Sequence, residues 1–431
     1  MIWLIIYNNI IKVYKLNLDI NQKVDKANER RYYHNNRNDF RQAEIYGGMN
    51  MYRESFSLPC SIIRGGTSKG VYFLESALPP AGEQRDKILL AIFGSPDLRQ
   101  IDGLGGANSL TSKVCIIGAP SVENADVDYT FGQVSVDKAI IDWKGNCGNL
   151  TAGVGIFAIE QGLLKVTEPQ TTVRIYNTNS KKIIHATYRV KDGKVLSDGD
   201  YKIPGVPGTG AKIKIDFFHP SGSITGKLLP TGNPKDIIDL GEKGIFHISI
   251  VDAGNPVVYL VASELGLKGT ELPTEVEGMP EVLKLIEEIR SIAAEMIGIV
   301  PDRSLATSKS PAYPKIGFVS APQNYVNPEG LPISAADVDL VARLASMQKM
   351  HRAYMITGAV STGAAANIAG TVVHDVISDR AKSSNTLIIG NPYGPMEVTV
   401  DIKDGEIEKE GVYRTARKIL DGQVYIPYSR I

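Results

Sequence analysis

The chain has 431 residues, of which 43% are hydrophobic and 22% charged, and its formal net charge is zero. These values are typical of a globular protein with two or three domains. The neutral balance gives no electrostatic basis for binding nucleic acid or an anionic membrane surface. The three cysteines, Cys60, Cys115 and Cys147, cannot all pair with one another, and their spacing matches no metal-ligand pattern. We therefore expect a reducing, cytoplasmic setting and no bound metal.

Residues 1–50 differ in composition from the rest of the chain. The apolar stretch 1–6 is too short to span a bilayer and lacks the basic start and the cleavage site of a signal peptide. The polar segment 23–41 has little to bury, so we expect a leader that is disordered, loosely helical or absent from the native protein. Two glycine codons before Met49 could encode a purine-rich ribosome-binding site. A natural start at Met49 or Met51 is therefore a hypothesis, and the N-terminal mass of the native protein tests it.

From residue 55 onwards, apolar runs alternate with glycine-rich loops. In the first half we expect a short helix at 86–93, a buried helix at 150–163, and strands at 55–63, 70–75, 114–117, 126–136, 172–176, 183–190 and 211–218. In the second half we expect an amphipathic helix at 280–297, a helix at 334–349 opened by a capping box, a small-residue helix at 364–373, and strands at 245–251, 257–261, 315–319, 386–389, 396–402 and 424–426.

The order of these elements is similar in the two halves, although no residue-level repeat is visible. Each half places a glycine loop between strands and then a helix rich in small residues. The sequence therefore predicts an α+β protein with two like domains, at 51–235 and 236–431, whose final strands could pair with the first domain.

The first glycine loop is the leading candidate for a functional site. Its backbone amides could hold a carboxylate while the neighbouring lysine moves a proton. The plainer alternative is a hairpin turn with a solvated lysine. The candidate residues of this loop are Arg64, Gly65, Gly66, Thr67, Ser68 and Lys69.

Two further loops add candidates in the first half. The loop at 102–113 ends on a lysine before a strand, and the turn at 145–149 opens the buried helix. Cys147 would lie in the positive field at the start of that helix, which favours an anion and a reactive thiolate, although buried cysteines are often inert. The candidates here are Asn108, Ser109, Lys113, Asn146, Cys147, Gly148 and Asn149.

The second half supplies Ser361, Thr362 and Gly363, expected near the start of its own buried helix. Two helix N-termini facing each other across a cleft would hold the two ends of a dicarboxylate or tricarboxylate. Proton removal beside a bound carboxylate needs a positioned base and no cofactor.

Several motifs in this order resemble the PrpF family of methylaconitate isomerases, methylitaconate Δ-isomerases and oxalomesaconate tautomerases. The resemblance runs from about Ser55 to the C-terminus and rests on six segments: 64–70, 100–113, 145–149, 229–234, 252–256 and 414–417. It implies the diaminopimelate epimerase fold, in which two similar domains each curl a mostly antiparallel sheet around a central helix.

The resemblance also implies a cofactor-independent shift of a double bond or proton in an unsaturated dicarboxylate or tricarboxylate. It makes Lys69 the leading candidate for the proton-transfer base; in the mechanism that we expect, Cys147 or Ser68 either assists or only binds the substrate. The epimerases of this fold use two cysteines, one per half. This sequence keeps Cys147 but has Ser361 and Thr362 at the second place, which argues against a two-thiol racemase.

Other functions stay open at this level. They are an oxalomesaconate-type keto–enol tautomerase, an amino-acid racemase or epimerase of the same fold, and a non-catalytic accessory protein. A nucleotide enzyme is disfavoured because neither glycine loop fits a phosphate-binding motif. The expected partner is a small carboxylate, without nucleic acid or membrane, and both a monomer and a homodimer are compatible with the sequence.

Overall fold

The computed structural model describes residues 54–431, so the expectations for the leader at 1–50 and for a start at Met49 or Met51 lie outside the described residues. The described chain divides into two units. The small unit joins residues 54–56 to Pro427–Ser429, where the rings of Phe56 and Tyr428 lie 5.3 Å apart. The other unit, which holds Ser57–Ile426, contains the candidate site.

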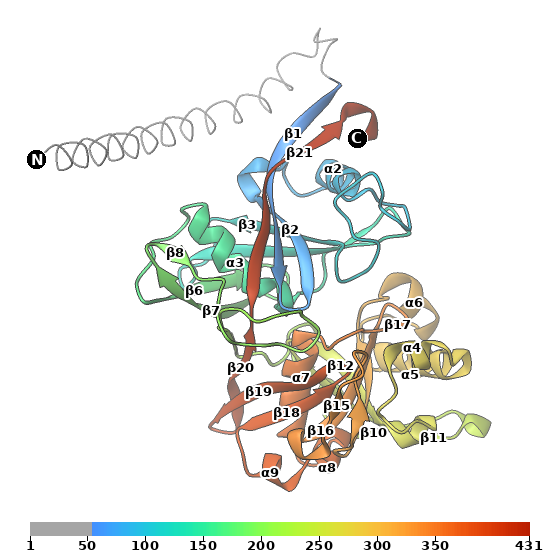
Figure 1. Cartoon of the computed structure of the whole chain (residues 1–431). Helices are drawn as coiled ribbons and strands as arrows, with labels where there is room; N and C mark the ends of the chain where they lie inside the picture. Colours follow the sequence, from blue (N-terminus) through green and yellow to red (C-terminus); the bar gives the residue numbers. More distant parts are fainter. Residues whose placement is uncertain (1–53) are drawn as a thin grey trace, which may run out of the picture. The chain divides into compact units, whose positions relative to one another are not determined.

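The first half of this unit is built from short strands and two helices (Figure 1). The helices are α2 (Glu83–Phe93) and α3 (Gly148–Glu160). The strands are β1 (Ser55–Gly65), β2 (Ser68–Leu74), β3 (Lys113–Gly118), β4 (Val127–Val134), β5 (Ile141–Asp142), β6 (Gln170–Asn177), β7 (Lys182–Lys191), β8 (Lys194–Val195) and β9 (Ile213–Phe218).

The second half has more helices. They are α4 (Pro273–Glu277), α5 (Pro280–Met296), α6 (Ala306–Lys309), α7 (Ile356–Ala366), α8 (Val372–Val376) and α9 (Asp379–Lys382). Its strands are β10 (Asp236–Asp239), β11 (Ile245–Ala253), β12 (Asn255–Val261), β13 (Lys315–Ser320), β16 (Leu340–Ser346), β17 (Lys349–Met350), β18 (Thr386–Asn391), β19 (Gly394–Lys403), β20 (Glu406–Arg414) and β21 (Ala416–Pro427), with β14 (Tyr325–Val326) and β15 (Pro332–Ile333) in a separate small sheet.

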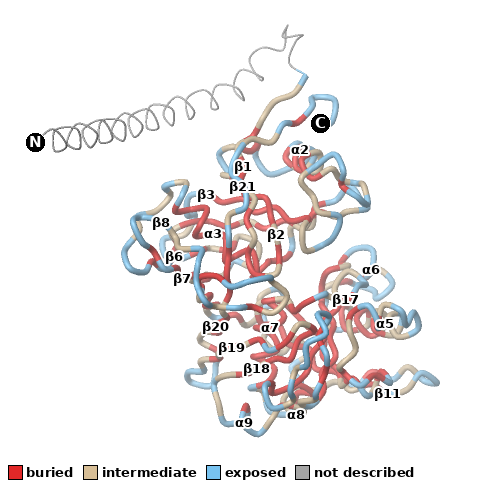
Figure 2. Tube along the Cα trace, viewed as in Figure 1, coloured by how far each residue is buried: buried red, intermediate tan, exposed pale blue. Residues whose placement is uncertain are grey.

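The remaining strands belong to one sheet that surrounds two buried helices, α3 and α7. Helix α3 packs against β2, β7 and β8, and α7 packs against β11, β12, β19 and β20. Every residue of α7 is buried, as is α3 except for its last residue, and the trace of both helices is buried in Figure 2. The expected α+β architecture, with sheet around central helices, is confirmed.

Small residues let the strands approach α3 closely. A Cβ on Gly153 would lie 2.4 Å from the hydroxyl of Tyr72, and one on Gly155 would lie 2.2 Å from the ring of Tyr188. Both tyrosines donate hydrogen bonds to backbone carbonyls of α3, at Leu150 and Thr151 respectively. Glycine at these positions therefore sets the depth at which the helix sits in the sheet.

The two halves are also joined through the sheet. Strand β20 pairs antiparallel with β9 of the first half and with β19 of the second. The proposed domain boundary near residue 235 stays a prediction.

Two expected helices are wrong in whole or in part. The segment 334–349 contains one 3-10 turn and then strands β16 and β17. Ser334 does cap a turn by accepting from the Ala336 amide, but the following run, from Leu340 to Ala345, is buried on both faces between β13 and β18. Helix α7 begins at Ile356, well before the expected 364–373, because Gly358 and Gly363 fit against neighbouring side chains and do not interrupt the helix.

Candidate active site

A cavity of about 100 Å³ lies where α3 and α7 begin. Cys147, Gly148 and Asn149 line it from the start of α3, and Met355, Ile356 and Thr357 from the start of α7. The two helix ends are in direct contact, since a Cβ on Gly148 would lie 2.4 Å from the side chain of Ile356.

Both helix ends present backbone amides towards this region. In α3 the first intrahelical bond runs from the Thr151 amide to the Cys147 carbonyl, so the preceding amides have no partner within the helix. In α7 the first such bond runs from Ala359 to Met355. The positive ends of two helix dipoles therefore point at one cavity, which favours a ligand with two or more carboxylates.

Two buried lysines line the cavity from different halves of the chain. Lys113 begins β3 and donates to the Gln133 side-chain oxygen at 2.7 Å, with its Nζ 5.0 Å from the centre of the Phe131 ring. Lys315 begins β13, and its Nζ lies 4.1 Å from the centre of the Tyr313 ring. Both ammonium groups thus lie over an aromatic ring, but Lys113 has a short hydrogen bond to a side-chain amide oxygen, whereas the oxygen partner of Lys315, the Ala312 carbonyl, is 3.5 Å away.

The pKa of Lys315 departs strongly from its ordinary value. Burial lowers its pKa from 10.5 to about 7, and the positive charge of Lys113 lowers it further, while Asp142 and Cys147 act in the opposite direction. Lys315 is only 5% exposed. A substantial part of this amine is therefore neutral at pH 7 and able to accept a proton.

His351 is a third nitrogen group in the cavity wall. Burial lowers its pKa to about 4, and the charges of Lys113 and Lys315 act in the same direction, so its ring is neutral at pH 7. The Ala353 amide donates to its Nδ1 at 3.2 Å, which places the ring proton on Nε2. His351 can therefore donate one hydrogen bond to an oxygen of a bound ligand.

Tyr313 closes the cavity against the turn that precedes α3. A Cβ on Gly145 would lie 1.6 Å from the Tyr313 hydroxyl, so only glycine fits there. Burial raises the pKa of Tyr313 above its ordinary value, which keeps the phenol neutral.

Seven of the residues predicted from the sequence line this cavity: Ser68, Ser109, Lys113, Asn146, Cys147, Gly148 and Asn149. The cavity thus brings together residues from all three glycine-rich segments of the first half. Cys147 is the N-cap residue of α3, and its side chain makes no capping hydrogen bond.

The remaining residues of the first glycine loop lie outside the cavity lining, and several of them contact Asn149 at the start of α3. Gly65 and Gly66 lie against Asn149, where a Cβ on either would lie within 2.4 Å of an Asn149 oxygen. Thr67 accepts a hydrogen bond from the Asn149 side chain, and Arg64 donates to the carbonyls of Gly66 and Thr415. This loop therefore holds Asn149 at the helix start and has no side chain in the cavity apart from Ser68.

Lys69 does not line the cavity. Ser68 does, and side chains alternate along a strand, so the Lys69 side chain leaves β2 on the opposite face. The Lys69 amide donates to the Leu110 carbonyl, which ties the first loop to the second. Asn108 is likewise outside the cavity and shapes the second loop by accepting from the Leu110 amide.

Ser361, Thr362 and Gly363 lie in the middle of α7, away from the cavity lining, because the helix begins earlier than expected. The Ser361 hydroxyl donates to the Val251 carbonyl and the Thr362 hydroxyl donates to the Gly358 carbonyl. Thr357 occupies the place at the helix start that was expected for them, and it accepts a hydrogen bond from Asn255.

The sequence interpretation missed Tyr313, Lys315 and His351. The sequence shows Lys315 only as the first residue of an apolar strand, and it shows His351 as a lone histidine in a turn. Their chemistry depends on burial beside Lys113, which is distant in the chain, so no local pattern identifies them.

Comparison with known proteins assigns the chain to a family. Residues 55–427 match the model of the PrpF protein family. The chain is 46% identical to the 3-methylitaconate isomerase of Eubacterium barkeri over 88% of its own length and 99% of that protein. It is 39% identical to the 2-methyl-aconitate isomerase of Shewanella oneidensis, covering 88% of this chain and 98% of that one.

Solved structures agree with this assignment. The crystal structure of a methylitaconate-delta-isomerase matches with a TM-score of 0.75 at 46% identity, over 88% of this chain and 97% of that one. A hydroxyproline epimerase from Agrobacterium vitis shares the fold, with a TM-score of 0.51 at 12% identity over 88% of this chain and 94% of that one. The chain belongs to the PrpF family, and it is an isomerase.

Proposed function

We propose that this isomerase shifts a double bond in a small unsaturated dicarboxylate or tricarboxylate of the methylitaconate or methylaconitate type. The observation that carries the proposal is the convergence of two buried lysines and one thiol on a cavity at two helix N-termini. The names of the relatives, an isomerase of 3-methylitaconate and one of 2-methyl-aconitate, support this substrate class.

The cavity has features that suit both ends of such a molecule. Lys113, Lys315 and Lys349 line it with one carboxylate, Asp142, so cations predominate. An apolar part of the wall is formed by Phe131, Met347, Met350, Met355 and Ile356. Carboxylates would bind at the lysines and helix amides, and a methyl or methylene group would contact the apolar wall.

In the proposed reaction the neutral amine of Lys315 takes the proton from the allylic carbon. The electron pair of that C–H bond forms the new double bond, and the pair of the old double bond takes a proton from the Cys147 thiol. The protein is left with an ammonium at Lys315 and a thiolate at Cys147, and return of the proton from the ammonium to the thiolate restores the starting state.

Charge builds up on the carboxylate side of the dienolate during this shift. The Lys113 ammonium, the His351 Nε2–H group and the amides at the helix starts are placed to stabilise that charge. Lys113 and Lys315 thus have different roles, since the burial of Lys315 lowers its pKa and Lys113 adds positive charge beside it.

The test is proton NMR in D₂O with purified protein and a panel of 3-methylitaconate, cis-2-methylaconitate, trans-aconitate and 4-oxalomesaconate. We expect solvent deuterium to enter one of the methyl compounds together with migration of its double bond. Exchange into 4-oxalomesaconate alone would assign the keto–enol tautomerase instead. Substitution of Lys315, Lys113 and Lys69 by methionine in parallel tests the roles, and a loss confined to Lys69→Met would return that residue to the role of base.

A further inference from the structure

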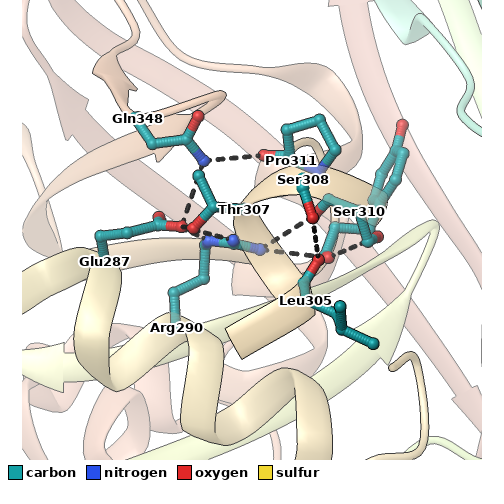
Figure 3. Close-up of polar contacts among 9 residues, drawn as sticks. Glu287, Arg290, Leu305, Thr307, Ser308, Ser310, Pro311 and Gln348 are labelled. Carbon is teal, nitrogen blue, oxygen red and sulfur yellow. Dashed lines mark hydrogen bonds and ion pairs between the residues drawn. The ribbon is translucent and has the colours of Figure 1, made fainter. Parts of the chain in front are cut away.

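Behind the cavity wall of the second half, three segments of chain meet at an ion pair between a buried arginine and a partly exposed glutamate (Figure 3). Arg290, on α5, is 1% exposed and donates two hydrogen bonds to the carboxylate of Glu287, at 2.6 and 2.7 Å. The Glu287 carboxylate also accepts from Thr307 at 2.6 Å and from Gln348 at 3.3 Å. None of these four residues lines the cavity.

The third nitrogen of the Arg290 guanidinium holds the segment that leads into β13. Its Nη1 donates to the carbonyls of Ser310 and Tyr313, at 3.0 and 3.2 Å. The Ser310 hydroxyl donates to the same Tyr313 carbonyl at 2.8 Å. Two residues further on is Lys315, so Arg290 fixes the backbone from which both Tyr313 and Lys315 enter the cavity.

The same cluster holds the turn between β16 and β17. The Gln348 amide contacts the Pro311 carbonyl at 3.5 Å, and the Met347 backbone amide donates to that carbonyl at 3.1 Å. Met347 and Gln348 have φ values of +54° and +57°, two successive left-handed residues of which neither is glycine or asparagine. Such a backbone persists only where its surroundings fix it, and this turn carries Met347 and Lys349 into the cavity wall.

We propose that Arg290 and Glu287 are positioning residues for the isomerisation, which hold the Tyr313–Lys315 segment and the Met347–Gln348 turn in the geometry that proton transfer needs. The inference rests on the proposed function of this cavity. Neither residue touches the substrate; they act through the backbone of two segments that do.

A planar guanidinium is suited to this arrangement. Its fork bonds the Glu287 carboxylate on one side and leaves a further nitrogen for the two carbonyls, which a lysine ammonium could not reproduce. Because Arg290 is buried, removal of Glu287 would leave its guanidinium without a counter-charge, and removal of Arg290 would release the two carbonyls. Water could then reach Lys315, whose other charged or titratable neighbours are Lys113 on β3, Asp142 on β5, Cys147 at the start of α3, Tyr313 and His351.

The experiment compares Arg290→Met with wild type by two measurements. The first is an NMR titration of lysines labelled with ¹³C at Cε, in which Lys315 is assigned by its absence in Lys315→Met. We expect its midpoint to rise by about one unit or more as water enters. The second is steady-state turnover, in which we expect kcat to fall about 10- to 100-fold while KM changes less than about 3-fold.

Arg303→Met is the matched control. It removes an ion pair to Glu295 on the same helix that contacts neither segment, so both measurements should stay at the wild-type values. A folded Arg290→Met variant with an unchanged Lys315 midpoint and kcat within about 2-fold of wild type would overturn the proposal.

If Arg290→Met does not fold, Arg290→Lys takes its place. It keeps a cation beside Glu287 but cannot bond both the Glu287 carboxylate and the carbonyls of Ser310 and Tyr313. A shift of the Lys315 midpoint in the same direction supports the proposal, and no shift overturns it. The titration needs no substrate, so it stays decisive even if no compound of the panel is turned over.

Discussion

The role of Lys315 can be tested through the pH dependence of the reaction. With a pKa of about 7, roughly half of the Lys315 amines are neutral at pH 7, and about one tenth at pH 6. If Lys315 is the base, kcat/KM should fall about tenfold for each pH unit below about 6 and should level off above about 8. With the ordinary value of 10.5, the neutral fraction at pH 7 would be smaller by about three orders of magnitude.

Two substitutions distinguish a role of Lys315 in proton transfer from a role of its positive charge. Lys315→Met removes both, and we expect kcat to fall about 10²- to 10⁴-fold. The acid limb of the pH profile, which is the fall in kcat/KM at low pH, should disappear. Lys315→Arg keeps a cation beside the substrate carboxylate but supplies no base at neutral pH, so it should bind substrate and turn it over as poorly as Lys315→Met. Deuterium incorporation followed by NMR measures both variants.

A matched control is Lys243→Met, which removes an exposed ion pair to Glu288, and neither of these residues lines the cavity. It should reproduce the wild-type pH profile. If Lys315→Arg retains activity within a few-fold of wild type, Lys315 acts only as a cation and the reasoning is wrong. The same holds if Lys315→Met keeps an acid limb with its midpoint near 7.

Three further predictions concern other parts of the chain. Cys147→Ser should lower kcat by about 10²-fold or more because a hydroxyl is a weaker acid than a thiol, as measured in the same NMR assay. Gly145→Ala places a Cβ 1.6 Å from the Tyr313 hydroxyl and should cost about 1–3 kcal/mol of stability and most of the activity, whereas Gly422→Ala, with its nearest neighbour at 3.8 Å, should change neither. Glu410 is fully buried with neither carboxylate oxygen hydrogen-bonded, and burial raises its pKa well above 4.5. The folded state therefore keeps a proton that the unfolded chain loses above about pH 4.5, so stability should fall by up to about 1.4 kcal/mol per pH unit above that point, and Glu410→Gln should abolish this slope in urea unfolding.

The sequence predicts the parts of the fold that depend on local pattern. Apolar runs between glycine-rich turns identify most strands, and the spacing of apolar residues identifies α5 almost to the residue. The buried helix α3 is also recognisable, because a helix rich in glycine and alanine has no polar face to expose.

The errors arise where tertiary contacts outweigh local signals. Ser334 caps a single turn, as its sequence signal predicts. The chain beyond this turn nevertheless forms β16, because β13 and β18 supply partner strands on its two sides. In α7, glycines that would lower helix propensity in isolation allow close packing against Leu344 and Val398. The expected start of α7 is therefore too late in the chain, and Thr357, not Ser361 or Thr362, lines the cavity at the start of this helix.

The sequence identifies more of the residues that line the cavity in the first half of the chain than in the second. The first half brings its site residues from glycine-rich loops, which are visible as motifs. The second half contributes Lys315 and His351 from the end of a strand and from a turn, and a lysine or histidine there carries no distinguishing pattern. Lys69 is the predicted base because it lies in the most visible motif. Side chains alternate between the two faces of β2, however, and Ser68, not Lys69, lines the cavity.

The composition of the cavity bears on the kind of isomerisation. A racemase of this fold needs two matched acid–base groups on opposite faces of one carbon, supplied by two thiols. Here Cys147 is the single cysteine in the lining, and burial raises the thiol pKa of Cys60 to about 11 and that of Cys115 well above its ordinary value. The second half of the chain adds the amine of Lys315 to the lining. An amine and a thiol differ in basicity and in position, which suits removal of a proton at one carbon and its return at another. The pairing of unlike groups therefore favours a double-bond shift over inversion at a single centre.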